Sequence, residues 1–318
     1  MNSPHLIHRL LLISLLGLSA CSGNGSLEGL FAPNPELPGG NFPTPIPSPT
    51  ISPTPSPNNS PIPTPSPTSS LPLSPGQFSD IEEVPEPFRD YIQDLAELEV
   101  LSAVEGGDRF DPNKPITRRE YARWLITANN TINASVSSKQ IRPGSKTDQP
   151  AFQDVAVSDP DFGSIQGLAE AGLIPSKLSG DDTAIKFRPD APLTREDLVH
   201  WKVPLDNRKA LPTATIDQVK ETWGFQDATK ISPEALKAVY SDFQNGEKAN
   251  IRRVFGFTTL FQPKKAITRA QAAASLWYFG FQGEGISATE ALEIQSSESL
   301  PTDQPSPSPN QTLSNPRT

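Results

Sequence analysis

Apolar residues recur at helical spacing in three segments of the central chain. In the first segment they fall at i, i+3, i+4, i+7 and i+10, which aligns them on one helix face: Phe88, Tyr91, Ile92, Leu95 and Leu98. The second segment copies the first, since Ile92-Gln-Asp-Leu-Ala-Glu97 returns as Ile165-Gln-Gly-Leu-Ala-Glu170. The third keeps the period with other residues: Ala235, Leu236, Val239, Tyr240 and Phe243. No stretch alternates convincingly as a strand does, so the pattern predicts a mainly α fold.

A second helix is predicted after each segment by a shared start signal. A Phe-x-Pro segment leads, seven residues after its Phe, to a Thr-Arg pair: Phe110 to Thr117, Phe187 to Thr194, and Phe261 to Thr268. The Thr hydroxyl can cap the helix, and Glu120 or Gln271 can complete a capping box, whereas Asp197 is too short to do so well. Apolar residues follow each cap: Tyr121, Trp124, Leu125 and Ala128; Leu198, Val199 and Trp201; Ala272, Ser275, Leu276 and Phe279. Pro204 is expected to cut the second of these helices short.

The whole arrangement occurs three times. Each occurrence opens with Phe-x-Asp, and the openings lie 74 and 73 residues apart. We therefore divide this part of the chain into copy one (78–130), copy two (152–204) and copy three (225–281), with polar connectors at 131–151 and 205–224. Neither helix of a copy can bury its apolar face alone, so the three copies are expected to pack together.

The N-terminus carries an export signal. Residues 1–20 contain an apolar run that is too short to cross a bilayer, and they are predicted to be a secretory signal peptide. Leu18-Ser19-Ala20-Cys21 resembles the bacterial lipobox, which implies cleavage before Cys21 and a lipid on this only cysteine of the chain. An ordinary signal peptide with an incidental cysteine is the alternative. Ser22 in the next position favours the outer membrane over retention at the inner one.

Residues 21–77 and 282–318 are rich in Pro, Ser and Thr. Residues 33–77 carry almost no charge and few large apolar side chains, so they cannot form a core. We predict a disordered, semi-rigid polyproline spacer there, with a Pro-rich ligand for another protein as the alternative. The tail at 282–318 is also predicted to be disordered, apart from one or two turns of helix starting at Ser287.

The three copies resemble the repeats of the S-layer homology family. The resemblance rests on the Phe-x-Asp opening, the Phe-x-Pro segment and the Ile-Thr-Arg-x-Glu box, and it covers 78–280. Copy one matches best, because copies two and three have Asp197 and Gln271 where the family prefers Glu. Copies one and three also lack the Gly that the family has after its first helix. The resemblance implies three helix-loop-helix repeats in a pseudo-threefold arrangement, with one helix of each in a central bundle, here on a lipoprotein of a cyanobacterial type.

The resemblance also nominates a ligand site in the grooves between repeats, which bind cell-wall polysaccharide in the family. The arginine after Thr is one of the groove residues, here Arg118, Arg195 and Arg269. A cation at the first position of a helix opposes the helix dipole, so helix stability does not explain these arginines. A guanidinium offers a planar fork for a carboxylate, and an uncapped helix N-terminus nearby would add N–H donors.

Three opening aspartates complete the candidate ligand residues: Asp80, Asp154 and Asp227. They could accept sugar hydroxyls. Alternatively, they could cap the first helix of their copy or brace an arginine.

Other chemistry is poorly represented in the sequence. Without the signal peptide, His200 is the only histidine and Cys21 the only cysteine, so a zinc site or a Cys–His nucleophile is not expected. The sequence has no Gly-x-Ser-x-Gly elbow and no phosphate-binding Gly-rich loop. The net charge of −9 argues against nucleic acid and assigns any acidic ligand to local arginines. We therefore predict no catalytic residue, no metal site and no cofactor.

Together these features predict a non-catalytic, lipid-anchored protein of the cell envelope. Its copies would bind peptidoglycan-associated polysaccharide, and the lipid on Cys21 would hold a membrane, so the chain would link the two across its spacer. The expected location is the outer membrane, facing the periplasm. The alternative is a scaffold for other envelope proteins that has lost glycan binding. A cell-wall enzyme is less favoured, because nothing beyond the copies provides a second domain.

Overall fold

A computed structural model describes residues 78–104 and 107–298 of the chain, and this part is mainly helical. The predicted signal peptide, Cys21 and the whole spacer lie outside the described residues. The helices and strands are, in chain order, α1 (Phe88–Glu97), α2 (Arg118–Ile132), α3 (Phe162–Glu170), α4 (Arg195–Asn207), α5 (Ile216–Trp223), α6 (Pro233–Phe243), α7 (Asn250–Phe255), α8 (Arg269–Leu276), β1 (Tyr278–Phe281), β2 (Glu284–Ser287) and α9 (Ala288–Glu298).

The helices predicted from the hydrophobic pattern are present. The three apolar segments form α1, α3 and α6, and the helices expected after the Thr-Arg pairs are α2, α4 and α8. Each of the latter begins directly after its Thr, whose hydroxyl accepts the N–H three residues on: Thr117 from Glu120, Thr194 from Asp197, and Thr268 from Gln271. The apolar stripes are buried, as Ile92 in α1 and Ile165 in α3 show.

Helix α4 passes through Pro204 and ends at Asn207, so the prediction that this proline cuts the helix short is wrong. A proline inside a helix loses one backbone hydrogen bond and crowds the preceding turn. Here burial offsets that cost, because Val203 and Leu205 on either side belong to the core. The helix therefore extends into the segment 205–224, which was expected to be only a polar connector and which also contains α5.

The chain after α8 departs most from the prediction. Phe279 was expected on that helix, but the helix ends at Leu276 and Phe279 lies in β1, which pairs with β2 in antiparallel fashion. The strands are joined by Gln282 and Gly283, whose φ angles of 52° and 88° suit a two-residue hairpin loop. A Gln-Gly pair is a weaker hairpin signal than Asn-Gly, which explains why the sequence did not indicate these strands.

The helix predicted to start at Ser287 is present as α9, but it runs for 11 residues instead of one or two turns, and the residues before it form β2 instead of being disordered. Residues 299–318 lie outside the described residues. Glu290 accepts hydrogen bonds from the N–H and the hydroxyl of Ser287 at 2.7 and 2.8 Å, which starts the helix. The C-terminal part is also bonded to α1, because Trp277 Nε1 and the Thr289 hydroxyl both donate to Asp94, at 2.8 and 2.5 Å. These tertiary contacts order a segment whose composition alone favours disorder.

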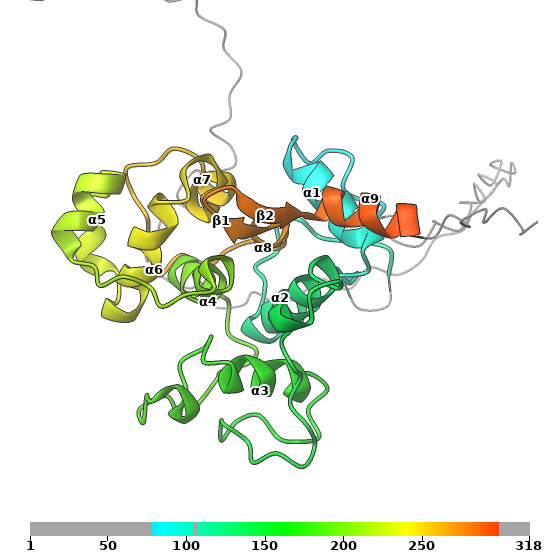
Figure 1. The fold of residues 1–318 in the computed structure, drawn as a ribbon, viewed down its shortest axis with the longest axis horizontal. Helices are drawn as coiled ribbons and strands as arrows, with labels where there is room; N and C mark the ends of the chain where they lie inside the picture. Colours follow the sequence, from blue (N-terminus) through cyan, green and yellow to red (C-terminus); the bar gives the residue numbers. More distant parts are fainter. Residues whose placement is uncertain (1–77, 105–106, 299–318) are drawn as a thin grey trace, which may run out of the picture. The chain divides into compact units, whose positions relative to one another are not determined.

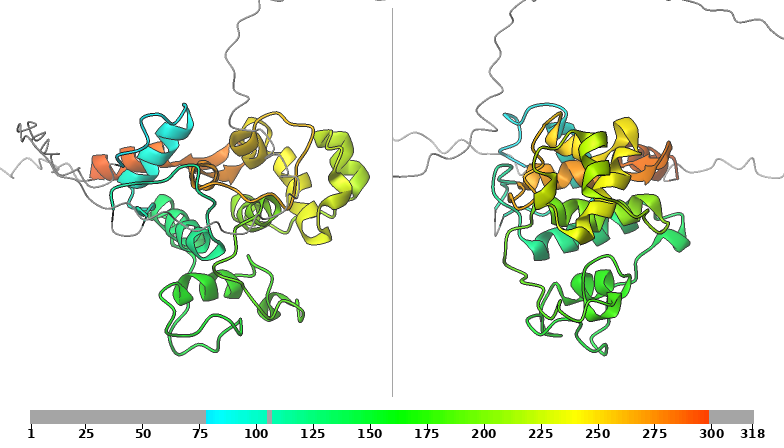
Figure 2. Two further views of the ribbon diagram at one scale, coloured as in Figure 1. Left: turned by 180° about the vertical axis from the view of Figure 1, so that it is seen from behind. Right: turned by 90° about the vertical axis from the view of Figure 1, so that its left-hand side faces the viewer.

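The second helices of the three copies meet through their side chains. The Tyr121 hydroxyl of α2 lies 3.0 Å from Ser275 Oγ of α8, and the ring of Tyr121 lies 6.1 Å from that of Trp201 in α4. The first helices lie further out, each on the second helix of another copy: α3 packs on α2, α6 on α4, and α1 on α8 (Figure 1). Seen from behind, the green segment with α3 and the yellow segment with α6 lie on different sides of these second helices (Figure 2).

The missing glycine after the first helix does not change the turn in copy one. Glu99 has a φ of 58°, close to the 69° of Gly172 at the same place in copy two. The closing hydrogen bond is also the same, from Val100 to Leu95 at 2.9 Å in copy one and from the corresponding residues of copy two at 3.0 Å. Copy one therefore forms this turn with Glu99, whose Cβ makes the positive φ sterically unfavourable.

Candidate functional site

Each opening aspartate holds the Phe-x-Pro segment of its own copy. Both carboxylate oxygens accept backbone N–H groups, from the Phe and from the residue after it: Asp80 from Phe110 and Asp111 at 2.7 and 2.8 Å, Asp154 from Phe187 and Arg188 at 2.8 Å each, and Asp227 from Phe261 and Gln262 at 2.8 and 2.7 Å. The residue after the Phe has a positive φ in every copy, 51°, 58° and 52°. The carboxylates thus support a strained turn, and none of them caps the first helix of its copy. Binding of sugar hydroxyls by these aspartates stays a prediction.

The starts of α2, α4 and α8 are sealed by backbone carbonyls of another copy. The first N–H of each helix donates across at 2.9 to 3.0 Å: Arg118 to Ala191, Arg195 to Lys265, and Arg269 to Lys114. The second N–H donates to the proline of the same Phe-x-Pro segment: Arg119 to Pro189, Glu196 to Pro263, and Ala270 to Pro112. The first two N–H groups of these three helices are therefore not available to an anion, and donation by another, uncapped helix N-terminus stays a prediction. We call these contacts joint 1–2, joint 2–3 and joint 3–1, after the copies that they connect.

The arginine side chains cross the same joints. Each donates to the carbonyl of the Phe in the facing copy: Arg118 Nε to Phe187 at 2.8 Å, Arg195 Nη1 to Phe261 at 3.0 Å, and Arg269 Nε to Phe110 at 2.5 Å. Each guanidinium also lies over an aromatic ring: 4.8 Å from Trp201 for Arg118, 4.3 Å from Phe255 for Arg195, and 4.7 Å from Trp124 for Arg269. Arg suits this stacking better than Lys does. The joints supply a tertiary reason for three arginines that helix stability does not explain.

The acidic residue of the Thr-Arg box is the partner of an arginine from the preceding copy. Two joints show the ion pair: Arg269 with Glu120, and Arg118 Nη1 with Asp197 Oδ2 at 3.0 Å. Copy three has Gln271 in this position, and no ion pair to a carboxylate is formed by Arg195 among the described residues. Its Nε is buried without a hydrogen-bond partner in this part of the chain. Joint 2–3 therefore lacks an ion pair to its arginine, although Lys264 and Glu196 form another ion pair across the same joint.

The pairing changes the capping boxes that the sequence predicted. Asp197 completes the box after all, because it accepts the Thr194 N–H at 3.2 Å and the Thr194 hydroxyl at 2.7 Å. In copy one the box is only half formed: Thr117 accepts from the Glu120 N–H at 3.3 Å, but the Glu120 side chain reaches Arg269 instead. For the Glu120 carboxylate, the ion pair with a buried guanidinium is more favourable than a hydrogen bond from one backbone N–H.

The three arginines differ in their access to solvent. Arg195 and Arg269 are 3% and 2% exposed, whereas the side chain of Arg118 is 18% exposed. Burial lowers the pKa of Arg269 to about 10, so this guanidinium remains charged at neutral pH, and burial also lowers the pKa of Arg195. Both side chains are enclosed inside the joints. Ligand binding by these arginines stays a prediction, and Arg118 has the best access to a ligand.

A buried polar cluster at α4 was missed by the sequence analysis. Lys202 is fully buried, pairs with Asp206 and donates to the Tyr278 carbonyl at 2.8 Å. Asn250 donates to Asp206 at 2.8 Å and to Asp242 at 2.9 Å. Burial lowers the pKa of Lys202 to about 8. The i, i+4 spacing of Lys and Asp predicts their pairing, but not their burial, and the cluster connects α4 to α6, α7 and β1.

The described residues contain no group of three or more His, Cys, Asp and Glu side chains arranged to hold a metal ion. His200 is half-buried on α4, and burial lowers its pKa below the usual value. Cys21 lies outside the described residues. Within residues 78–104 and 107–298, no helix combines the length and the apolar character that crossing a bilayer requires.

Comparison with known families finds a match for most of copy one. The model of the S-layer homology domain matches residues 77–122, from the Phe-x-Asp opening into the start of α2. No curated protein matches the chain. The matched stretch contains Asp80, Thr117 and Arg118, which are the residues that build the strained turn and the first joint. Residues 77–122 are thus similar to the S-layer homology domain, which supports a binding role at the cell surface or cell wall.

Proposed function

We propose that this chain is a non-catalytic lipoprotein of the cell envelope whose three copies form a pseudo-threefold assembly that binds a cell-wall polysaccharide. The family match at residues 77–122 carries this proposal, because it relates one copy to a cell-surface binding domain. Copies two and three share the role, since they repeat both the sequence pattern and the contacts of copy one.

Two sets of equivalent contacts support the pseudo-threefold arrangement. The joints run from copy one to two, from two to three, and from three back to one, with hydrogen bonds at corresponding positions. The first helices pack on the second helices in the same cyclic order, because α3 lies on α2, α6 on α4 and α1 on α8. A closed ring gives every copy two neighbours, and thereby buries apolar faces that no copy could bury alone.

The proposed attachment to a membrane depends on residues outside the described range. A lipid on Cys21 would hold the chain to the outer membrane, and residues 33–77 would separate the copies from the bilayer. Cys21→Ala should release the protein from the membrane fraction of lysed cells. Retention of this variant in the membrane fraction would refute lipid anchoring.

Co-sedimentation with purified peptidoglycan sacculi tests the binding function. The purified chain is mixed with intact sacculi and with sacculi from which acid has removed the attached polymer. We expect sedimentation with intact sacculi and little with stripped ones. Equal sedimentation with both would assign the ligand to peptidoglycan itself, and no sedimentation with either would refute the proposal.

The burial of the arginines favours a second function. Arg195 and Arg269 are enclosed in their joints, which fits copies that have lost glycan binding and serve as a scaffold for other envelope proteins. This alternative requires that the chain fail to sediment with sacculi. It further requires that cross-linking in intact cells join the described part of the chain to a defined envelope protein.

A further inference from the structure

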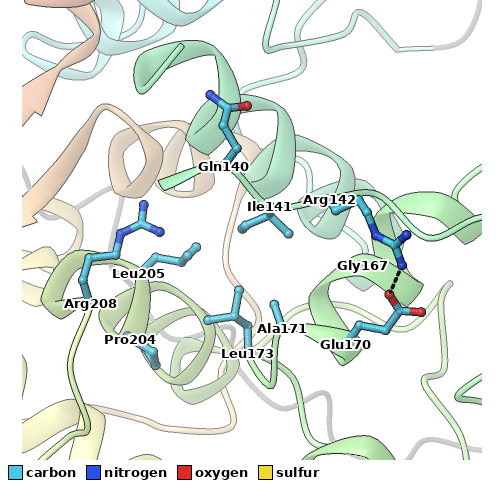
Figure 3. A pocket seen from close by; sticks show the side chains of 10 residues that line it. All are labelled: Gln140, Ile141, Arg142, Gly167, Glu170, Ala171, Leu173, Pro204, Leu205 and Arg208. Carbon is cyan, nitrogen blue, oxygen red and sulfur yellow. Dashed lines mark hydrogen bonds and ion pairs between the residues drawn. The ribbon is translucent and has the colours of Figure 1, made fainter. Parts of the chain in front are cut away.

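A cavity of about 390 Å³ lies between α3, the connector that follows α2, and the last turn of α4. Its floor is aliphatic and is formed by the buried side chains of Ile141, Leu173 and Leu205. Two guanidinium groups, those of Arg142 and Arg208, lie on different sides of it (Figure 3). Its volume falls in the range of small-molecule sites, about 300–1,000 Å³. The cavity lies at the end of α4, whereas joint 1–2 and joint 2–3 meet the start of that helix. The 13 residues of α4 span roughly 20 Å, which separates the cavity from those joints.

The backbone around α3 places Arg142 at the rim. Gly167 lets the connector lie directly against the helix, because a Cβ there would come within 2.5 Å of the Arg142 carbonyl oxygen. Arg142 Nη2 donates to Glu170 at 3.3 Å, and the Arg142 side chain is 76% exposed. Its Nε and Nη1 groups have no hydrogen-bond partner among the described residues. This arginine therefore keeps donors available to a ligand.

Arg208 stands on the other side in a backbone conformation that favours glycine. It directly follows α4 with a φ of 53°, whereas the residue that directly follows α5 is Gly224, with a φ of 72°. Its Nη1 and Nη2 donate to the Lys139 carbonyl at 3.2 Å and to Asn129 at 2.5 Å, and its Nε has no partner in the described part of the chain. These two bonds explain why an arginine stands where glycine would relieve strain, and they hold its guanidinium beside the cavity.

We propose that this cavity binds a small carboxylate ligand with an aliphatic body, presented by the cell wall. The carboxylate would accept N–H bonds from Arg208 and Arg142, and the body would lie on Ile141, Leu173 and Leu205. The cavity rim holds two cations and one carboxylate, that of Glu170, so its charge is positive although the chain carries −9. The proposal deepens the wall-binding function, on which it rests, by placing a ligand away from the enclosed arginines of the joints.

Two wall components offer this chemistry, a peptide stem that ends in a carboxylate and an acidic sugar. The cavity lining contains aliphatic side chains and no aromatic ring on which a sugar could stack. Methyl-bearing residues with a terminal carboxylate fit such a floor better, so the structure favours the peptide stem.

An amide NMR titration of the purified full chain tests the ligand class. The probes are acetyl-D-alanyl-D-alanine, the same dipeptide with an amidated C-terminus, N-acetylmuramic acid and N-acetylglucosamine. We expect shifts at Leu173 and Leu205 with the dipeptide acid, and binding about tenfold weaker for the amide, because the charge-assisted bonds are lost. A preference for N-acetylmuramic acid over the dipeptide would assign the ligand to the sugar. Equal binding of each acid and its neutral analogue would overturn the proposal.

Three variants locate the site. Arg142→Gln removes an exposed cation with little effect on folding and should weaken binding of the dipeptide acid. Glu170→Gln removes the competing carboxylate and should strengthen it. Arg89→Gln is the control, since Arg89 of α1 pairs with the exposed Glu86 and lies outside the cavity. If Arg142→Gln binds as the wild type does, or if Arg89→Gln weakens binding equally, the cavity is not the site.

Sedimentation with sacculi separates this proposal from the function on which it rests. If the wild type and Arg142→Gln sediment equally, the wall-binding function stands and the cavity proposal fails. If the wild type does not sediment but still binds the dipeptide acid, the cavity binds carboxylates and the wall-binding function fails.

Discussion

The ion pair of joint 3–1 gives the sharpest test of the joints. Arg269 is 2% exposed, and its guanidinium donates to the carbonyls of Phe110 and Ser102 at 2.5 Å each and to the carboxylate of Glu120. Glu120→Gln preserves the shape of the side chain and one acceptor oxygen, and removes only the negative charge. The variant therefore measures what the carboxylate contributes to a buried guanidinium.

The structure sets the expected size of this effect. Removal of one partner from a fully buried ion pair costs about 3–5 kcal/mol. Here the Glu120 side chain is 18% exposed and the amide oxygen still accepts a hydrogen bond, so the loss is reduced to the difference between a charged and a neutral acceptor. We expect the free energy of unfolding to fall by about 2 kcal/mol, which lowers the Tm of a domain of this size by roughly 4–8 °C.

Urea unfolding followed by circular dichroism measures the free energy directly. Gln271→Glu is the opposite change in copy three, and it should stabilise the chain by about 1 kcal/mol because it offers Arg195 a carboxylate partner in the position that Glu120 and Asp197 occupy in the other two copies. Glu221→Gln, at an exposed position of α5, is the matched control and should leave the free energy of unfolding unchanged. A loss below about 0.5 kcal/mol for Glu120→Gln, in the range of surface pairs, would show that the carboxylate does not stabilise the joint.

Three further predictions follow from single residues. Glu99→Gly should leave the free energy of unfolding unchanged or raise it by up to about 1 kcal/mol, whereas Gly172→Ala should lower it by about 1–2 kcal/mol, since only glycine accepts the positive φ without strain. Thermal melting that shows the opposite order would contradict the turn geometry. Asp154→Asn should cost about 2 kcal/mol in urea unfolding, because one of two backbone N–H groups loses its acceptor. Because burial holds the pKa of His200 below 6.5, the unfolded chain binds the proton first, so stability should fall as the pH drops below 6.5 and should be fully restored above it. His200→Gln should remove this dependence from melting curves, and an unaltered pH profile would show that another group causes it.

The local sequence determined the elements that depend on near neighbours. The spacing of Ile92 and Leu95 repeats every helical turn, and the Thr117 hydroxyl needs only the N–H three residues on, so α1 and the start of α2 could be predicted without the fold. The repeat of the pattern also predicted that Arg118, Arg195 and Arg269 would occupy equivalent places. In the same way, the Phe-x-Asp opening singled out the three aspartates, although not the backbone groups that they bind.

Tertiary structure decided whatever depends on residues far apart in the chain. Glu120 does not complete its capping box, because its carboxylate pairs with Arg269 of copy three. Asp197 both caps its own helix and pairs with Arg118, because joint 1–2 brings these two residues together. Helix α4 continued past Pro204 because burial outweighed a local cost. The chain after Leu276 became a hairpin and a helix because β1 packs on α4 and α9 packs on α1. Such outcomes are set by packing between segments that the linear order does not place side by side, so no local propensity contains them.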